Sequence, residues 1–191
     1  MNITVYAASS GQVPAAYTEV ASQLGTEIAL AGHTLVNGAG RLGLMAATTD
    51  ACLKAGGRTV GVIPEFMVEQ GWQHDGMSEL IVTQSMHERK ETMIKIAGAC
   101  VALPGGCGTM EELLEAITWK QLGLFLKPIV ILNVGGYYDS MLAQLNKAVD
   151  ERFMRPMHTQ LWATAATAKE AVRLCEETPE WDRSLRKYAA L

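Results

Sequence analysis

The sequence predicts an α/β fold, a Rossmann-like, doubly wound parallel sheet with helices on both faces. Short apolar segments rich in β-branched residues alternate along the chain with longer segments of helical periodicity, which favours parallel strands joined by right-handed crossovers. The apolar segments contain few polar residues, as expected for strands that helices cover on both faces. With 191 residues, the chain fits a single domain spanning residues 1–191.

Each expected element follows from one of these two patterns. The strands are expected at Ile3–Ala7, Thr34–Val36, Thr59–Ile63, Glu79–Thr83, Cys100–Leu103 and Pro128–Leu132. The helices are expected at Ala15–Ala31, Gly43–Ala55, Glu88–Ala97, Met110–Leu122, Ser140–Glu151 and Ala168–Glu177. The final segment, Glu177–Leu191, is expected to form a short polar helix or tail.

One stretch, Pro64–Ser78, fits neither pattern. Its mixed polarity and its glycines, Gly71 and Gly76, predict a loop beyond the carboxyl end of a strand. In parallel sheets of this kind, ligands bind at that edge of the sheet. The segment could close over a ligand, but its composition favours a plain surface loop.

The charge balance and hydropathy exclude several classes of partner. The net charge is −4, whereas proteins that bind nucleic acid or anionic membranes usually present a basic face. Any phosphate site must therefore be local, built from a loop and one or two cations. No apolar segment reaches the roughly 20 residues that span a bilayer, and the opening MNITVYAASSG predicts a strand and not a signal peptide. We expect a cytoplasmic protein with no nucleic-acid or membrane partner.

The cysteines and histidines predict no disulfide framework and no metal site. The four cysteines form no CxxC pair, which suits free thiols in a reducing compartment. The four histidines lack the HExxH spacing of a zinc hydrolase. The cysteines are Cys52, Cys100, Cys107 and Cys175, and the histidines are His33, His74, His87 and His158.

The first glycine-containing segment is YAASSG, Tyr6–Gly11, directly after the first expected strand. Ser9 and Ser10 could donate hydrogen bonds to a phosphate or a ribose. They could equally begin the next helix or turn, because serine is favoured at both positions. Composition alone leaves both roles open.

The second segment is NGAGRLGLM, Asn37–Met45, in which Gly38, Gly40 and Gly43 have the spacing of a dinucleotide-binding loop. The segment follows the second strand and not the first, and it lacks the acidic residue about 20 positions on that binds the ribose of NAD. Arg58 could suit a 2′-phosphate, but it is a single residue. We therefore favour tight packing of a strand against a helix, close to a bound nucleotide.

The third segment is LPGGCGTMEE, Leu103–Glu112. Its glycines allow the backbone to approach a ligand closely, and the start of the following helix attracts an anion. These glycines are Gly105, Gly106 and Gly108. Two carboxylates, Glu111 and Glu112, follow within one turn and would repel a phosphate. The segment therefore combines a phosphate site with acidic groups that must have another purpose.

Helix capping is one such purpose. Thr109-x-x-Glu112 has the spacing of a capping box, and acidic residues in a first turn complement the helix dipole. The spacing alone favours this role, although a cap does not require three glycines. Cys107 lies near the helix start, where a thiol can become nucleophilic; with no histidine close in sequence, we interpret it as a small residue that fills the loop.

A pair of cations lies one strand–helix unit earlier, in SMHERKETM, Ser85–Met93. Arg89 and Lys90 stand at the expected start of a helix, where cations are disfavoured unless an anion compensates them. Consecutive strand–helix loops of a parallel sheet emerge at the same edge. Arg89 and Lys90 can therefore face the glycine segment that follows Leu103.

MHERKETM together with LPGGCGTMEELLEAITWKQLG closely resembles the Lonely Guy (LOG) family, which is often mislabelled lysine decarboxylase. The paired signatures are R-K-x-x-M and P-G-G-x-G-T-x-x-E, and the resemblance extends to NGAGRLGLM and KPIVILNVGGYYDSML, from Val5 to about Val172. Ala39 and Ala46 stand where glycines are common in the family. Pro64–Ser78 does not match, so a substrate-contacting acid there, with Glu69 as the candidate, is not assigned by the resemblance.

The resemblance implies a nucleotide-binding hydrolase of cytokinin biosynthesis. Such an enzyme cleaves the N-glycosidic bond of a nucleoside 5′-monophosphate, either an N6-substituted adenine nucleotide or AMP, into free base and ribose 5-phosphate. It implies no metal and no organic cofactor, and it implies a homodimer. An alternative is a non-catalytic carrier of a phosphorylated cofactor such as a molybdopterin-type ligand. The Arg89 and Glu112 pair favours the enzyme, because a carrier does not need it.

The resemblance also assigns roles to residues. Glu112 would be the catalytic carboxylate, with Glu111 as the fallback, and Arg89 the catalytic cation. Met86 would form a wall for the base or would pack in the core. The residues expected to bind substrate are Lys90, Gly105, Gly106, Gly108, Thr109, Glu111, Met86, Gly40 and Ser9.

Overall fold

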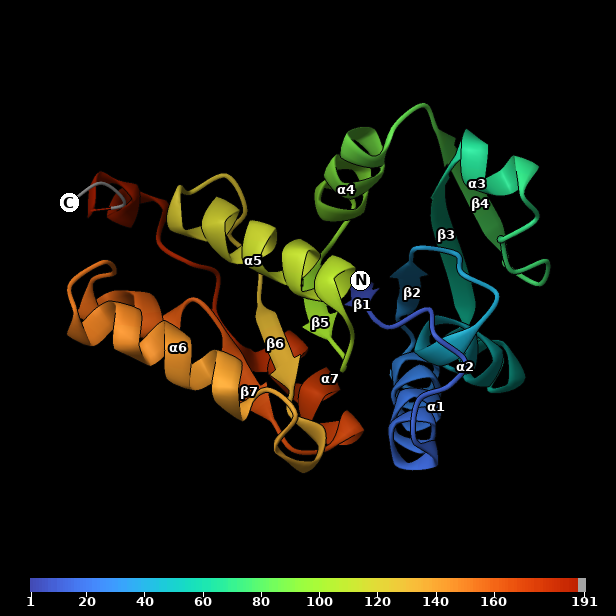
Figure 1. Cartoon of the computed structure of the whole chain (residues 1–191), viewed down its shortest axis with the longest axis horizontal. Coiled ribbons are helices and arrows are strands. Elements are labelled where there is room, and N and C mark those ends of the chain that lie inside the picture. Colours follow the sequence, from blue (N-terminus) through green and yellow to red (C-terminus); the bar gives the residue numbers. More distant parts are fainter. Residues whose placement is uncertain (189–191) are drawn as a thin grey trace.

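A seven-stranded parallel sheet forms the centre of the molecule (Figure 1). The computed structural model describes residues 1–188. The strands are β1 (Asn2–Tyr6), β2 (Thr34–Asn37), β3 (Arg58–Pro64), β4 (Glu79–Thr83), β5 (Ala99–Ala102), β6 (Ile129–Leu132) and β7 (Ala163–Ala165). They lie in the order β4-β3-β2-β1-β5-β6-β7, and every neighbouring pair is parallel. The predicted fold class is confirmed.

Helices cover both faces of the sheet. They are α1 (Ala15–Leu30), α2 (Gly43–Lys54), α3 (Glu65–Glu69), α4 (Met86–Lys95), α5 (Cys107–Gln121), α6 (Asp139–Asp150) and α7 (Ala168–Glu177). On one face, α1, α2 and α7 pack against strand residues such as Val5 and Val130. On the other face, α4, α5 and α6 pack against residues such as Val62 and Ile131. Burial on both faces explains why the strands are nearly continuous apolar runs.

Helix α4 begins at Met86, two residues before the expected start at Glu88. The Ser85 hydroxyl accepts a hydrogen bond from the Glu88 N–H (3.1 Å), and the Glu88 carboxylate accepts one from the Gln84 N–H (2.7 Å). This Ser-x-x-Glu pattern is a capping signal, and it marks Ser85 as the residue before the helix. The sequence therefore contained the correct boundary.

One strand and one α-helix were not predicted, and neither were the 3-10 helices Val134–Gly136 and Pro156–Gln160. Strand β7, Ala163–Ala165, is three residues long and two of them are alanine, so it shows no apolar period. Helix α3, Glu65–Glu69, is a little more than one turn inside the segment expected to be a loop. The rest of that segment, up to Ser78, has no helix and only an isolated bridge between Gly40 and Gln73.

The order of the strands determines where a ligand can bind. From β1, the chain adds β2, β3 and β4 on one side of the sheet, and from β5 it adds β6 and β7 on the other. The carboxyl ends of β1 and β5 therefore flank a topological switch point, where such folds bind ligands.

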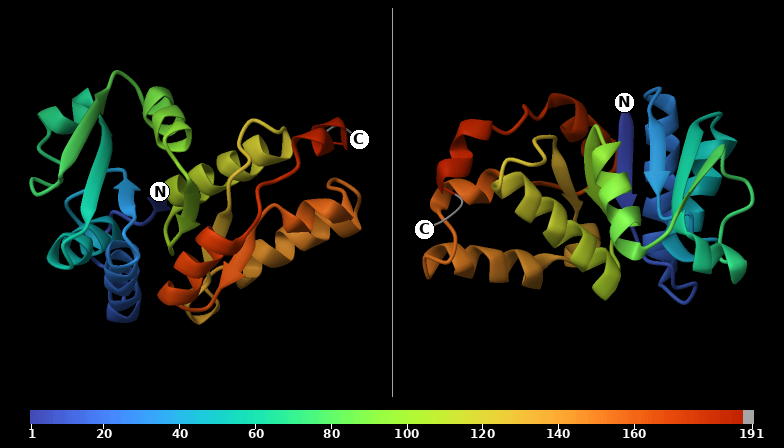
Figure 2. Two further views of the ribbon diagram at one scale, coloured as in Figure 1. Left: turned by 180° about the vertical axis from the view of Figure 1, so that it is seen from behind. Right: turned by 90° about the horizontal axis from the view of Figure 1, so that it is seen from above.

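The C-terminal segment lies at the end of the molecule away from β4 (Figure 2). It ends in a 3-10 helix, Arg183–Tyr188, as part of the polar helix or tail that was expected. Residues 189–191 of that prediction lie outside the described residues. Within the described part of the chain, no helix combines the length and apolar character needed to cross a membrane.

Candidate active site

A cavity of about 580 Å³ opens at the carboxyl edge of the sheet. Its walls come from the segments that follow β1, β2, β3, β4 and β5, so it lies beside the switch point. Nine of the predicted site residues line it: Ser9, Gly40, Met86, Arg89, Gly106, Gly108, Thr109, Glu111 and Glu112. The structure therefore brings together residues from four separate stretches of sequence.

A buried ion pair forms one wall of this cavity. Arg89 of α4 donates through Nη1 to Oε1 of Glu112 on α5, at 2.6 Å. The two residues are only 6% and 8% exposed. A charge-assisted hydrogen bond in such surroundings is strong and fixes the direction of both side chains. The predicted meeting of these two motifs at one sheet edge is what the structure shows.

The neighbouring backbone holds Arg89 in this position. Its Nε donates to the carbonyl oxygen of Val62 on β3, at 3.1 Å. Gly38, on the segment after β2, leaves space for the guanidinium, because a Cβ there would lie 1.9 Å from Arg89 Nη2. One glycine of the apparent dinucleotide motif is therefore required by an arginine of the same chain.

Burial raises the pKa of the Glu112 carboxyl, while the Arg89 guanidinium opposes the shift. The carboxylate is thus held by one strong partner in a site that excludes most water. Such a group can respond strongly to positive charge that develops beside it, because the local dielectric screens little.

The start of α5 forms part of the cavity lining. The helix begins at Cys107, three residues earlier than predicted, and Gly106 precedes it without any side-chain cap. Gly106 and Gly108 border open space, since a Cβ on either would meet no heavy atom within 4 Å. The N–H groups of this first turn are therefore available to a ligand.

The capping-box prediction for Thr109 and Glu112 is wrong. Because α5 begins at Cys107, both residues lie inside the helix, and the Glu112 carboxylate pairs with Arg89 instead. Gly105 has a steric role: a Cβ there would lie 2.1 Å from the Thr109 hydroxyl oxygen. Gly105 itself does not line the cavity.

Two tyrosines fix the glycine segment from behind. The Tyr137 hydroxyl donates to the Gly105 carbonyl oxygen, and the Tyr138 hydroxyl donates to the Leu103 carbonyl oxygen, both at 2.7 Å. Tyr138 is buried, and the two rings pack edge to face. The segment GGYYDS therefore positions the start of α5.

The other glycines of the segment after β2 pack closely, as we expected. A Cβ on Gly40 would lie 3.0 Å from the Met45 methyl carbon. Gly43 has a φ of +67°, and an added Cβ would lie 2.6 Å from the carbonyl oxygens of Ala8 and Ser10. These contacts join the segments after β1 and β2 into one wall of the cavity.

Lys90 does not line the cavity. Its Nζ forms ion pairs with Glu111 and with Glu115 (3.3 Å to Glu115), so it links α4 to α5. Burial acts to lower the pKa of Lys90, but the hydrogen bonds to Glu111 and Glu115 outweigh burial and raise this pKa. The structure thus places Lys90 against the carboxylates and not at the glycine segment. Glu69 and Cys107 are exposed and also lie outside the lining.

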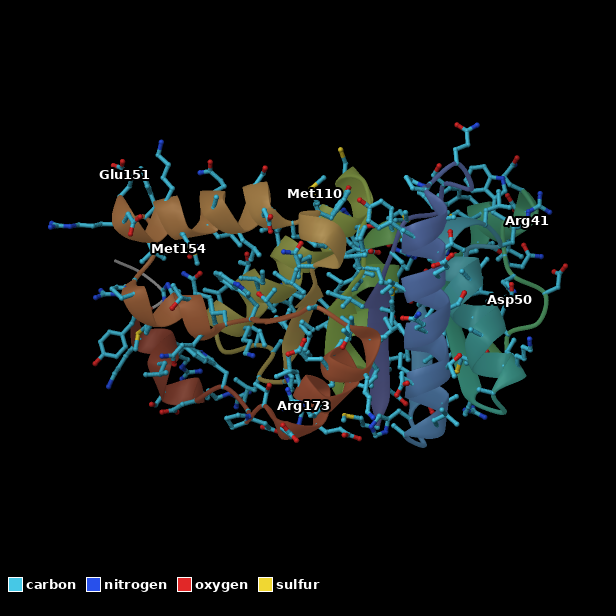
Figure 3. The ribbon with its side chains drawn as sticks, turned by 90° about the horizontal axis from the view of Figure 1, so that it is seen from below. Arg41, Asp50, Met110, Glu151, Met154 and Arg173 are labelled. Carbon is cyan, nitrogen blue, oxygen red and sulfur yellow. The ribbon has the colours of Figure 1, made fainter. Side chains whose placement is uncertain are left out.

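Sequence reasoning missed several lining residues: Arg41, Leu42, Met45, Met67 and Trp72. Arg41 and Asp50 lie on the same side of the molecule, next to the segment after α3 (Figure 3). The Arg41 N–H donates to the Trp72 carbonyl oxygen (3.0 Å), and Asp50 pairs with His74 (2.9 Å). These contacts join two segments that have no shared motif, so no local sequence signal could reveal them.

Comparison with known proteins decides the family. Residues 45–175 match the family described as "Possible lysine decarboxylase". The chain is 43% identical over 186 residues to cytokinin riboside 5′-monophosphate phosphoribohydrolase LOG7 of Arabidopsis thaliana, covering 97% of this chain and 86% of that protein. It is 40% identical over 184 residues to the phosphoribohydrolase LOG of Oryza sativa subsp. japonica, covering 96% and 76%. The chain belongs to the Lonely Guy family.

Solved structures similar to this Lonely Guy protein support its fold. The molybdenum cofactor carrier protein of Chlamydomonas reinhardtii has a TM-score of 0.69 at 24% identity, covering 92% of this chain and 96% of that one. The molybdenum cofactor binding protein of Rippkaea orientalis has a TM-score of 0.68 at 23% identity, covering 92% and 93%. At these identities the likeness concerns the fold alone.

One departure from the Lonely Guy pattern has a structural cost. Ala39, where a glycine is common in the family, has a φ of +57°. That conformation costs a non-glycine residue about 1 kcal/mol. Its N–H donates to the Asn37 side chain (2.9 Å) and its carbonyl accepts from the His74 N–H (2.8 Å), so the surrounding backbone holds it there.

Proposed function

We propose that this chain hydrolyses the N-glycosidic bond of a nucleoside 5′-monophosphate, giving a free base and ribose 5-phosphate. The expected substrates are N6-substituted adenine nucleotides of the cytokinin type, AMP, or both. The buried Arg89–Glu112 pair, in one cavity with the uncapped start of α5, carries this proposal. The activity named for relatives at 43% and 40% identity supports it.

Glu112 is the catalytic carboxylate in this proposal. Glycosidic cleavage passes through an oxocarbenium-like transition state, which a carboxylate stabilises directly or through an activated water. The hydrogen bond from Arg89 orients Glu112 before the substrate arrives. Because the carboxylate is already aimed, no reorganisation is needed as charge develops at the anomeric carbon.

The 5′-phosphate binds at the start of α5. The backbone of Gly106 and Gly108 and the hydroxyl of Thr109 contact it, and Ser9 and the Gly40 backbone face it across the cavity. The helix dipole adds to this attraction. Glu111 also lines the cavity, but its pairing with Lys90 offsets the repulsion between its carboxylate and the phosphate. Lys90 thus acts on substrate through Glu111.

Met86 forms a wall for the base. It belongs to the first turn of α4, it is exposed, and it lines the cavity. A methionine at this position can adapt to bases of different shape, because its thioether chain is flexible.

We also propose a cytoplasmic homodimer whose protomers each form one nucleotide-binding domain. Strand β4 is the edge of the sheet next to β3, and its Leu80 and Val82 are exposed. Exposed apolar side chains on an edge strand favour association with another surface. Light scattering is expected to give twice the monomer mass, and a monomeric mass would contradict the dimer.

A non-catalytic carrier of a phosphorylated cofactor, such as a molybdopterin-type ligand, would also use an anion site at a helix start. A carrier has no need of a buried arginine aimed at a buried carboxylate, so the Arg89–Glu112 pair favours the hydrolase. A carrier purified from cells would retain a chromophore, which absorption spectroscopy detects.

Incubation with a panel of nucleoside 5′-monophosphates tests the proposed function. Chromatography should show free base and ribose 5-phosphate appearing in equal amounts from AMP, from N6-substituted adenine nucleotides, or from both. The matching nucleosides, which lack the phosphate, serve as controls and should be cleaved far more slowly. Release of no base from any nucleotide would overturn the proposal.

A further inference from the structure

The cavity has two chemically different ends. The segments after β5 and β1 contribute the glycine backbone, Ser9, Thr109 and the carboxylates. The segments after β3 and β4 contribute Met67, Trp72 and Met86, together with Arg89. Strands β5 and β1 are neighbours at the switch point, whereas β3 and β4 lie beyond β2 and end the sheet on the β1 side of that point (Figure 1). The cavity therefore carries its carboxylates at one end and its tryptophan with two methionines at the other.

Trp72 is the largest side chain of the apolar end. It is 47% exposed, whereas the other three tryptophans are buried or partly buried. An indole left open in a cavity wall offers a wide apolar face to a ligand. Two arginines of the lining, Arg41 and Arg89, also belong to segments that contact or form this end.

The backbone holds Trp72 in place although its side chain is exposed. Its N–H donates to the Met67 carbonyl oxygen (3.1 Å), and its carbonyl oxygen accepts from the Arg41 N–H (3.0 Å). Two residues on, the His74 N–H donates to the Ala39 carbonyl oxygen (2.8 Å). These bonds tie the segment to the loop after β2, so the indole is presented by a fixed backbone.

We propose that Trp72 is a specificity-determining residue that stacks on the purine base of the substrate. This inference rests on the proposed function, and it assigns to Trp72 the recognition of the base. With the phosphate at α5 and the anomeric carbon beside Glu112, the base points toward the β3–β4 end, where Trp72 lies. A purine offers a larger stacking face than a pyrimidine, so the contact favours adenine-type bases.

The flanking methionines fit the same role. Met67 and Met86 also line the cavity, and their flexible side chains can adapt to substituents of different size on the base. Trp72 would then fix the plane of the base, while the methionines would leave the edge of the base less constrained.

Equilibrium binding separates Trp72 from the chemistry. Calorimetry measures the affinity of AMP and of ribose 5-phosphate in a Glu112→Gln background, so that AMP is not consumed. Adding Trp72→Ala should weaken AMP binding about tenfold or more and leave ribose 5-phosphate binding within about twofold. Trp72→Phe should retain most of the AMP affinity, and Trp72→Leu should lose it, because only the aromatic ring stacks.

Phe66→Ala is the matched control. Phe66 lies on α3 in the same segment and is 49% exposed, but it does not line the cavity, so AMP binding should not change. Each variant should keep the mass of the parent chain by light scattering. Unchanged AMP affinity in Trp72→Ala, or equal weakening of AMP and ribose 5-phosphate, would overturn the proposal. Failure of the proposed function would appear elsewhere, as absence of base release by the unmodified chain.

Discussion

Arg89 is buried with three neighbours from three different segments. Glu112 accepts from its Nη1, the Val62 carbonyl accepts from its Nε, and Gly38 leaves room for its Nη2. A buried arginine without such partners would be strongly destabilising. The position of the guanidinium is therefore set by the fold, and any change at Gly38 acts on the site through Arg89.

Gly38→Ala is expected to lower base release from AMP by about a hundredfold, because the new Cβ would displace the guanidinium that aims Glu112. The same overpacking should lower the free energy of unfolding by about 1 to 3 kcal/mol. Gly11→Ala is the control, since a Cβ at Gly11 meets no heavy atom within 4 Å. Chromatographic rates and urea unfolding measure both effects. A wild-type rate of base release by Gly38→Ala would show that activity does not depend on the position of the Arg89 guanidinium.

At the scale of elements, α4 and α5 meet through two sets of ion pairs. Arg89 pairs with Glu112 in the cavity wall, and the adjacent Lys90, which does not line the cavity, pairs with Glu111 and Glu115. Consecutive residues of one helix thus contact consecutive residues of the other. The outer set fixes the separation of the helices at which the inner set forms.

Lys90→Met is expected to lower the free energy of unfolding by about 1 kcal/mol, because the ion pairs are only partly buried. The KM for AMP should rise, but by no more than about threefold, because Lys90 does not line the cavity and acts on the phosphate only by offsetting the charge of Glu111. Urea unfolding measures the free energy of unfolding, and steady-state kinetics measure the KM. Lys90→Arg is the control variant and should restore stability. A large rise in KM with unchanged stability would instead indicate direct contact with the phosphate.

Sequence patterns predicted the long helices from their regular period, as in Ala15–Leu30. They predicted the buried strands from continuous apolar runs, as in Ile129–Leu132. They failed at α5, where Thr109 and Glu112 match a capping box but lie inside the helix. Local spacing could not show that Glu112 has a stronger partner 23 positions earlier. The Arg89–Glu112 site was suggested by family motifs, whereas Trp72 belongs to none of them and its place in the lining required the folded chain.

At the scale of the whole molecule, one buried cation opposes folding. Lys120 of α5 is 2% exposed, and burial lowers its pKa to about 8. The unfolded chain keeps this proton up to its ordinary pKa of 10.5. Below about pH 8 both states are protonated and the folded state bears the full cost of the buried charge. Stability should therefore rise between about pH 8 and 10.5.

Lys120→Met removes this charge at similar volume and is expected to raise the free energy of unfolding at pH 7 by about 2 to 3 kcal/mol. The difference from wild type should shrink markedly at pH 10, where folded Lys120 is neutral. Urea unfolding at both pH values measures this difference in the free energy of unfolding. Lys54→Met, at an exposed position of α2, should leave the free energy of unfolding unchanged at both. An equal difference at both pH values would mean that Lys120 is not the titrating group.

The whole sheet brings these parts to one edge: the start of α5 after β5, the Arg89–Glu112 pair between α4 and α5, and Trp72 after β3. The central claim is that Glu112 performs the chemistry. The most direct measurement is release of free adenine from AMP by Glu112→Gln, which keeps the size of the side chain. We predict a loss of at least about a hundredfold, with ribose 5-phosphate still binding within about threefold. Turnover near the wild-type rate would contradict the account.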